Sequence, residues 1–121
     1  MNRARAFALA AVSTTLVLAA CGQPEAIECP TVQLPANGVL ADTSADIKSY
    51  GALLAGGYSG NVLPEAIRAV RDKYPGASDS EVRNFLIAAY CPIARGAGVG
   101  KDAQRAALQQ FEAALGANLA P

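Results

Sequence analysis

The chain of 121 residues contains no histidine and no tryptophan. Histidine is the commonest general base and the commonest metal ligand in proteins, so its absence removes the usual centre of acid–base and metal-dependent catalysis. About half of the residues are apolar, but many of these are alanine, and large side chains are few. We therefore expect a thin core built on close alanine contacts, with no metal and no cofactor.

Two segments approach catalytic motifs, and each lacks a required residue. Residues 96–101 end in Gly-Lys like a phosphate-binding loop, but Arg95 stands where the motif needs its first glycine and Asp102 where it needs serine or threonine. Residues 57–61 resemble part of a nucleophile elbow, but there is no histidine to activate Ser59. The sequence therefore predicts a protein that is not an enzyme.

The chain also lacks an excess of either charge, with ten basic and ten acidic residues. Arg3 and Arg5 lie in the first twenty residues, so the remainder carries eight basic and ten acidic residues and a net charge of −2. Nucleic-acid binding needs a basic stripe that neutralises phosphates. The mixed and mildly acidic remainder argues against a nucleic-acid partner.

No apolar run is long enough to span a bilayer, which takes about 20 residues. The longest candidate covers residues 7–18 and is weakened by Ser13, Thr14 and Thr15. It follows two arginines and leads through Ala19-Ala20 into Cys21. A positive start, a short apolar stretch and small residues before a cleavage point are typical of a secretory signal.

The tetrapeptide Leu18-Ala19-Ala20-Cys21 resembles the lipobox of bacterial lipoproteins at all four positions. The resemblance implies removal of residues 1–20 as a signal peptide, diacylglycerol on the Cys21 sulfur and often a further acyl chain, such as palmitate, on its amine. Residue 22 is glycine rather than the aspartate that retains lipoproteins at the inner membrane, so the periplasmic face of the outer membrane is expected in a diderm. The alternative is an ordinary secretory signal that ends in a cysteine by chance.

With Cys21 acylated, Cys29 and Cys91 remain in an oxidising compartment, which favours a disulfide between them. Closing a loop of this length contributes roughly 4 kcal/mol in the chain-entropy description. The alternative, a reactive dithiol, lacks the Cys-x-x-Cys spacing and a neighbouring histidine.

The rest of the sequence predicts an all-α fold, a small bundle of about four short helices closed by one disulfide. Residues 21–42 contain several prolines and an Asn37-Gly38 pair, and are predicted as a lipidated tether and irregular arm. Residues 43–121 are predicted as the helical domain, with Ser78 and Glu81 forming a capping box at the third helix. The expected helices cover residues 44–55, 61–74, 78–91 and 101–115. Thr43 is expected to cap the first, Asn61 to open the second, Pro92 to follow the end of the third and Gly116 to cap the fourth.

Tyr58 lies in a glycine-rich loop with no predicted element to bury it, which makes it a candidate partner contact. The alternative is a tyrosine that folds back over the thin core.

These patterns favour a membrane-anchored envelope lipoprotein with a small helical protein-interaction domain and an envelope protein as its partner. An inhibitor or immunity-type lipoprotein is the alternative within the binding class, and a small envelope hydrolase or thiol-redox protein is the alternative outside it. The stretch from Pro75 to Pro92 resembles uncharacterised small proteobacterial lipoproteins, which implies no specific activity.

Overall fold

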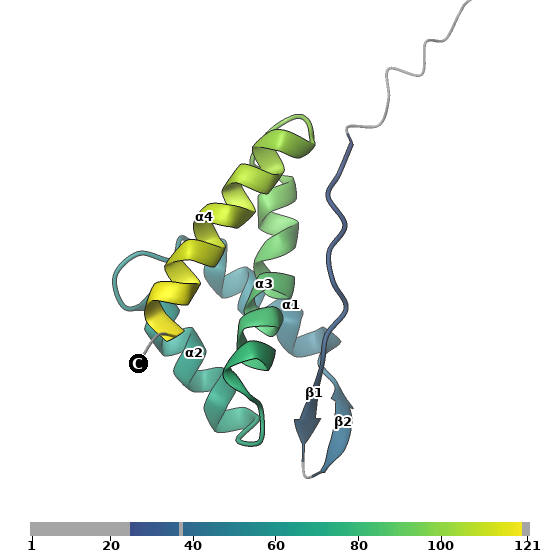
Figure 1. Ribbon diagram of the computed structural model, residues 1–121, viewed down its shortest axis with the longest axis vertical. Helices are drawn as coiled ribbons and strands as arrows, with labels where there is room; N and C mark the ends of the chain where they lie inside the picture. Colours follow the sequence, from purple (N-terminus) through teal and green to yellow (C-terminus); the bar gives the residue numbers. More distant parts are fainter. Residues whose placement is uncertain (1–24, 37, 120–121) are drawn as a thin grey trace, which may run out of the picture.

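The computed structural model describes residues 25–36 and 38–119 (Figure 1). The predicted signal peptide, Cys21 and Gly22 lie outside these residues. The chain starts as an extended arm, forms a two-stranded hairpin and continues into four helices. The elements are β1 (Gln33–Ala36), β2 (Val39–Asp42), α1 (Ser44–Leu54), α2 (Val62–Lys73), α3 (Asp79–Arg95) and α4 (Lys101–Leu119). The predominantly helical prediction is confirmed, and the hairpin makes all-α an approximation.

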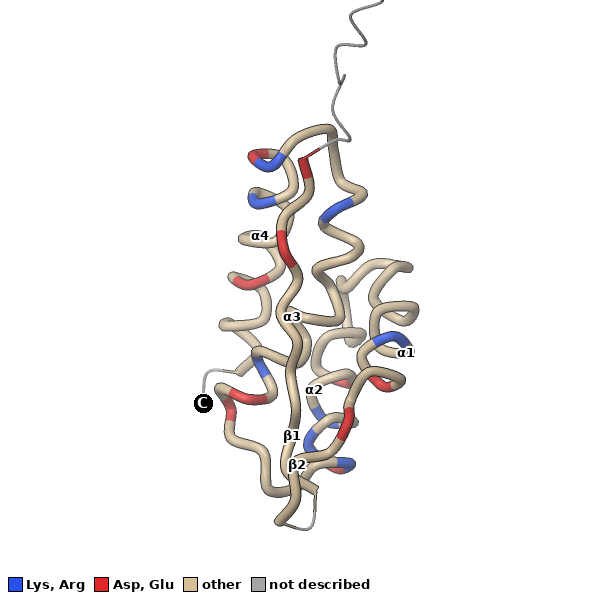
Figure 2. The backbone as a smooth tube through the Cα atoms, turned by 90° about the vertical axis from the view of Figure 1, so that its right-hand side faces the viewer, with Lys and Arg blue, Asp and Glu red and all other residues tan. Residues whose placement is uncertain are grey.

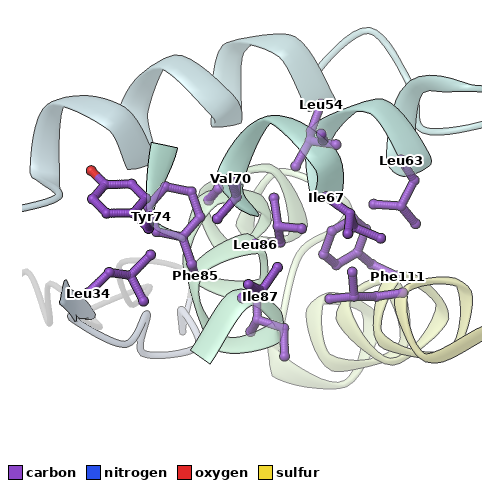
Figure 3. Packing of buried hydrophobic residues seen from close by; sticks show 14 residues of the cluster. Leu34, Leu54, Leu63, Ile67, Val70, Tyr74, Phe85, Leu86, Ile87 and Phe111 are labelled. Atoms are coloured by element: carbon purple, nitrogen blue, oxygen red, sulfur yellow. The ribbon is translucent and has the colours of Figure 1, made fainter. Parts of the chain in front are cut away.

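Helix α3 lies at the centre and packs against α1 on one side and α4 on the other (Figure 1). Because it is covered on several sides, its buried residues extend beyond a single stripe. Phe85, Leu86 and Ala89 are almost fully buried, as the helical spacing predicts. Figure 3 shows Phe85 and Leu86 meeting side chains from α1 and α2, with Phe111 of α4 nearby.

The hairpin corrects the prediction of an irregular arm. β1 and β2 pair antiparallel, with Leu34 opposite Ala41 and Ala36 opposite Val39. Gly38 has a φ of 82°, a value that glycine adopts without strain. An Asn-Gly pair between two short extended segments is a strong hairpin signal, so the sequence did contain this information. Leu34 has no exposed surface and joins the same core cluster as the helices, so the arm is part of the domain.

Helix α3 also corrects a predicted boundary. Its start has the predicted capping box, since the Ser78 hydroxyl accepts from the Glu81 backbone N–H at 3.2 Å and the Glu81 carboxylate accepts from the Ser78 N–H. It does not end before Pro92 but continues to Arg95. Proline removes one helical hydrogen bond, but Pro92 is exposed and the buried Ala94 beyond it favours one more turn.

Two other helix ends differ from the prediction. α4 runs through Gly116 to Leu119, so Gly116 is not its cap. Thr43 does not cap α1, because its hydroxyl donates to the Val32 carbonyl, and the Asp42 carboxylate accepts from the Ser44 N–H at 3.0 Å instead.

Gly51 allows α1 to approach α3 closely. A Cβ atom at this position would lie 2.9 Å from the backbone carbonyl oxygen of Ala89, which is closer than carbon and oxygen pack. The obstacle is helix backbone rather than a flexible side chain, so the two helices would have to separate. The contact between α1 and α3 therefore depends on the missing side chain.

We predict that Gly51→Ala lowers the free energy of unfolding by about 1–3 kcal/mol, the usual cost of forcing an extra methyl into a packed interface. Gly116→Ala is the matched control, because the added Cβ meets nothing within 4 Å in α4. It should raise stability by about 0.5–1 kcal/mol through helix propensity. Urea unfolding of both variants measures the difference, and equal effects would contradict the close-approach explanation.

Candidate functional site

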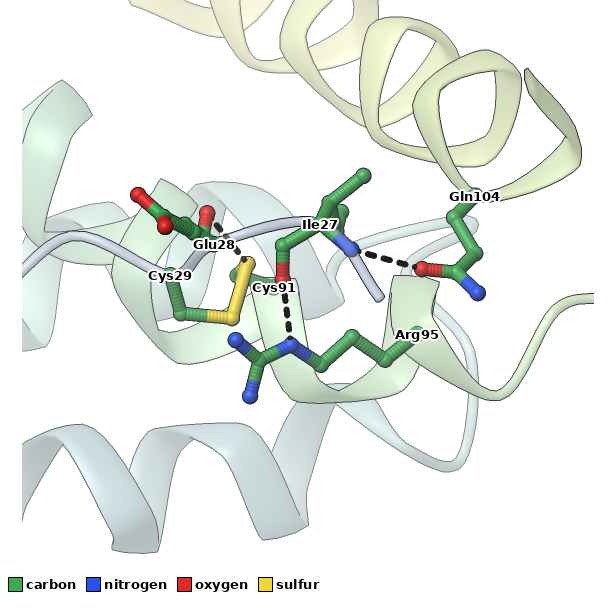
Figure 4. Close-up of a disulfide and its surroundings, with 6 residues drawn as sticks. All are labelled: Ile27, Glu28, Cys29, Cys91, Arg95 and Gln104. Atoms are coloured by element: carbon green, nitrogen blue, oxygen red, sulfur yellow. Dashed lines mark hydrogen bonds between the residues drawn. A yellow bond between two sulfur atoms is a disulfide. The ribbon is translucent and has the colours of Figure 1, made fainter. Parts of the chain in front are cut away.

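The disulfide holds the extended arm against α3. The Cys29 and Cys91 sulfur atoms lie 2.13 Å apart, with their Cα atoms 5.6 Å apart, as the sequence predicts (Figure 4). Cys91 has no exposed surface, and it forms a small second core with Ile27 and Ala94. Burial of Cys91 shields its sulfur from an attacking thiol, while Cys29 is half-buried, and the shielded sulfur favours the structural interpretation over the redox one.

Gln104 of α4 holds the arm at a second place. Its side chain is 2 % exposed, and its Oε1 accepts from the Ile27 backbone N–H at 2.9 Å (Figure 4). Its Nε2 donates to the carbonyl oxygens of Glu25 at 3.0 Å and Gly98 at 3.4 Å. Each buried polar atom of the amide therefore has a partner, and the three bonds join the arm, the α3–α4 loop and α4.

Arg95 completes this arrangement from the last turn of α3. Its Nε donates to the Ile27 carbonyl at 2.6 Å, so both backbone polar groups of Ile27 are bonded to side chains of the helices (Figure 4). We call Arg95, Gln104 and the Cys29–Cys91 disulfide the arm clamp. Only the disulfide was predicted from the sequence.

The sequence held one signal for Gln104. This residue lies four positions before Leu108, seven before Phe111 and eleven before Leu115, which places it on the inward face of α4. A polar residue at an inward position predicts a buried hydrogen-bonding role. Arg95 gave no such signal, because the predicted end of α3 placed it in a loop.

The clamp shortens the free part of the predicted tether. The sequence predicted attachment of the arm at Cys29, but the structure holds it from Glu25 onward. Only four residue steps separate Glu25 from Cys21. A chain spans at most about 3.3–3.6 Å per residue, so four residue steps span at most roughly 14 Å.

Tyr58 does not stand free of the core. Its ring packs edge-on against Tyr90, with centroids 5.5 Å apart, and against Phe111, with centroids 5.2 Å apart. Tyr90 and Phe111 stack in turn at 4.2 Å. The side chain is half-buried, which matches the alternative of a tyrosine folded over the core. Its use as a partner contact remains a prediction.

A polar cluster joins α1 to the end of α2. The Asp46 carboxylate accepts from the Lys73 Nζ at 2.7 Å and from the Tyr74 hydroxyl. The hydrogen bond from Lys73, followed by that from Tyr74, lowers the pKa of Asp46. Burial, followed by the bond to Asp46, raises the pKa of Tyr74 to about 12. Shifted pKa values can mark reactive groups, but packing and one ion pair account for these.

An apolar groove of about 380 Å³ lies between α1 and α3. Ile47 and Ala52 line it from α1, and Pro92 and Ile93 line it from α3. Ser44 and Lys48 supply its polar atoms. A second hollow, of about 420 Å³, lies between the arm at Glu28 and the start of α4 at Lys101 and Arg105. Acidic and basic residues are interspersed over that end of the molecule (Figure 2).

Within residues 25–36 and 38–119, no helix is long and apolar enough to cross a membrane. No group of three or more Cys, Asp or Glu residues in that part of the chain is arranged to hold a metal ion. No protein-family model, curated protein or solved structure matches the chain. The arm clamp and the α1–α3 groove are therefore interpreted from their own geometry.

We predict that Gln104→Leu destabilises the protein by about 1–3 kcal/mol, because it leaves the Ile27 N–H and the Glu25 carbonyl without their partners. It should also remove the protection of the Ile27 amide in hydrogen exchange while the amides of α2 keep theirs. Gln109→Leu is the control, since Gln109 is exposed on the same helix. Retained protection of Ile27 in Gln104→Leu would contradict the role given to this side chain.

We also predict that Asp46→Asn lowers the pKa of Tyr74 below 12 but leaves it above the ordinary 10.0, because burial is the larger cause. Since the folded-state pKa is raised, the stability contributed by neutral Tyr74 is complete below pH 10 and is lost as the pH rises toward 12. Tyrosinate absorbance, assigned by difference with Tyr74→Phe, measures the pKa. Asp72→Asn removes the same charge from an exposed neighbour, and an equal effect there would exclude the hydrogen bond as a cause.

Proposed function

We propose that the chain is the precursor of a bacterial lipoprotein, anchored in an envelope membrane by lipid on Cys21, whose small domain binds another envelope protein close to that membrane. The lipobox Leu18-Ala19-Ala20-Cys21 supplies the anchor in this proposal. The observation that carries it is the arm clamp, which fixes the domain four residue steps from the cysteine. One acyl chain gives only marginal membrane binding, and two or three give a stable anchor.

The arm clamp supports this function because it resists separation of domain and anchor. A flexible tether would let the domain range away from the bilayer. Here the disulfide and the bonds from Gln104 and Arg95 hold the arm at Glu25, Ile27 and Cys29. A domain held so near the surface is placed to meet partners in or beside the same membrane.

The α1–α3 groove supports the binding part of the proposal. Its lining is largely apolar and includes exposed positions such as Ala52 and Pro92. Concave apolar surfaces of this kind suit an apolar side chain of a protein partner. The net charge of −2 after residue 20 does not suit nucleic acid.

The anchor is tested by intact-mass spectrometry of the protein purified from the membrane fraction. We expect a product that begins at Cys21, carries two or three acyl chains and contains one disulfide. Cys21→Ser should lack the acyl mass. A product that keeps Met1, or that begins at residue 21 without acyl mass, would refute the lipoprotein assignment.

The binding surface is tested by a photo-crosslinking amino acid placed at Ala52 in intact cells. We expect an adduct of discrete mass with an envelope protein at position 52 and not at the exposed control position Gln109 on α4. An adduct with an incoming enzyme or toxin would instead identify the inhibitor or immunity-type alternative. Equal labelling at both positions would contradict a specific groove.

A further inference from the structure

The loop between α3 and α4, residues 96–100, presents an apolar side chain to solvent. Val99 is 92 % exposed, which is more than any other large hydrophobic residue in the described part of the chain. The loop lies at the end of the molecule where the arm begins (Figure 1). Val39 and Leu40, which are 69 % and 64 % exposed, lie in the hairpin at the opposite end (Figure 1).

The loop is held in place at Gly98, the residue before Val99. A Cβ atom on Gly98 would lie 2.7 Å from the Ala103 Cβ, so this glycine packs directly on the first turn of α4. Gly100 has a φ of 105°, which favours glycine. With the Gly98 carbonyl bonded to Gln104 and Gly98 packed on α4, the loop presents Val99 outward.

The same amide places this loop beside the predicted anchor. The Gln104 Nε2 is 3.0 Å from the Glu25 carbonyl oxygen and 3.4 Å from the Gly98 carbonyl oxygen. Because both oxygens accept from the same nitrogen atom, the carbonyl groups of Glu25 and Gly98 lie close together. Because four residue steps from Glu25 to Cys21 span at most roughly 14 Å, acylation of Cys21 would bring the residue next to Val99 close to the bilayer.

We propose that residues 96–100 form a membrane-contacting loop that inserts the Val99 side chain into the interface of the bilayer holding the anchor. The proposal rests on acylation of Cys21 and adds to it a defined orientation of the domain. The occupant of this surface is phospholipid, because the short tether brings the loop to the bilayer whenever the anchor is inserted.

Apolar contact rather than charge drives this association. Lys101 and Arg105 lie next to the loop at the start of α4, but Asp102 pairs with Arg105 at 3.7 Å and Glu28 lines the same hollow. With the two signs interspersed, attraction to anionic headgroups is largely cancelled. The contact should therefore persist at high salt, whereas a purely electrostatic one is screened.

The absence of tryptophan from the chain provides a direct test. Val99→Trp and Leu40→Trp each introduce a single tryptophan at an exposed site, one at either end of the molecule, and excitation at the red edge of the absorbance avoids the four tyrosines. Each acylated protein, with its acyl mass verified, is reconstituted into vesicles of phosphatidylethanolamine and phosphatidylglycerol, with and without lipids brominated near the headgroup. The matched design cancels the general preference of tryptophan for interfaces.

We expect the emission of Val99→Trp to shift to shorter wavelength on vesicles and to lose intensity with brominated lipid, at low and high salt. The emission of Leu40→Trp should not change. An unshifted and unquenched Val99→Trp on acylated protein would overturn the loop contact and leave the anchor intact. Quenching of Leu40→Trp instead would overturn the orientation.

Two further outcomes are distinct from these. A shift of Val99→Trp that depends on protein concentration and is insensitive to brominated lipid would indicate a second copy at this surface and overturn the lipid proposal. A membrane-purified protein without acyl mass would remove the anchor itself, and the loop contact would fall with the proposed function.

Discussion

The extended arm has few contacts of its own, and its position depends on side chains that come much later in the sequence. Gln104 and Arg95 bond the backbone of Ile27 and Glu25, and Cys91 is joined covalently to Cys29. Backbone N–H and C=O groups that are removed from water need hydrogen-bond partners. The buried Ile27 and the neighbouring Glu25 obtain theirs from these side chains. The clamp thereby fixes the start of the domain, the loop between α3 and α4 and the path into the hairpin at once.

The core around α3 is built from only a few large side chains. Alanines on α3 and Gly51 on α1 let the helix backbones approach closely. The few large residues can then pack against one another, Phe85 against Tyr50 and Phe111 against Tyr90. The arm adds Leu34 to this core and Ile27 to the smaller one beside the disulfide. A thin core is thus closed partly by a segment that would otherwise be a linker.

The sequence predicted the helices where local chemistry was clear. The capping box at Ser78 and the Gly56-Gly57 pair after α1 mark helix boundaries in the sequence. The apolar spacing of Leu63, Ile67 and Val70 in α2, and of Leu108, Phe111 and Leu115 in α4, indicates the inward faces. It failed where tertiary contacts override local preference. Pro92 remains inside α3 because Ala94 beyond it is buried, and Gly116 remains inside α4 because Leu119 beyond it packs against the core.

The site was less predictable than the fold, for a physical reason. A disulfide can be inferred from a cysteine count, but a glutamine that bonds an arm 77 residues away has no local signature beyond its inward register. The prolines of the arm favour irregular structure in the sequence, but Pro35 pairs with Leu40 in the short sheet, and the Asn37-Gly38 pair was the sequence signal for a hairpin. The sequence leaves open whether Tyr58 packs on the core, because its neighbours Tyr90 and Phe111 come from helices α3 and α4.

The long sequence separation of the clamp also has a consequence for the order in which the domain can form. The arm is synthesised first, but its partners Cys91, Arg95 and Gln104 emerge 62 to 79 residues later. Until Cys91, Arg95 and Gln104 have been synthesised, the segment from Glu25 to Cys29 lacks the partners that hold it. Contacts between such distant residues slow folding, which in the proposed lipoprotein would keep the newly made chain unfolded for longer and so suit it to export.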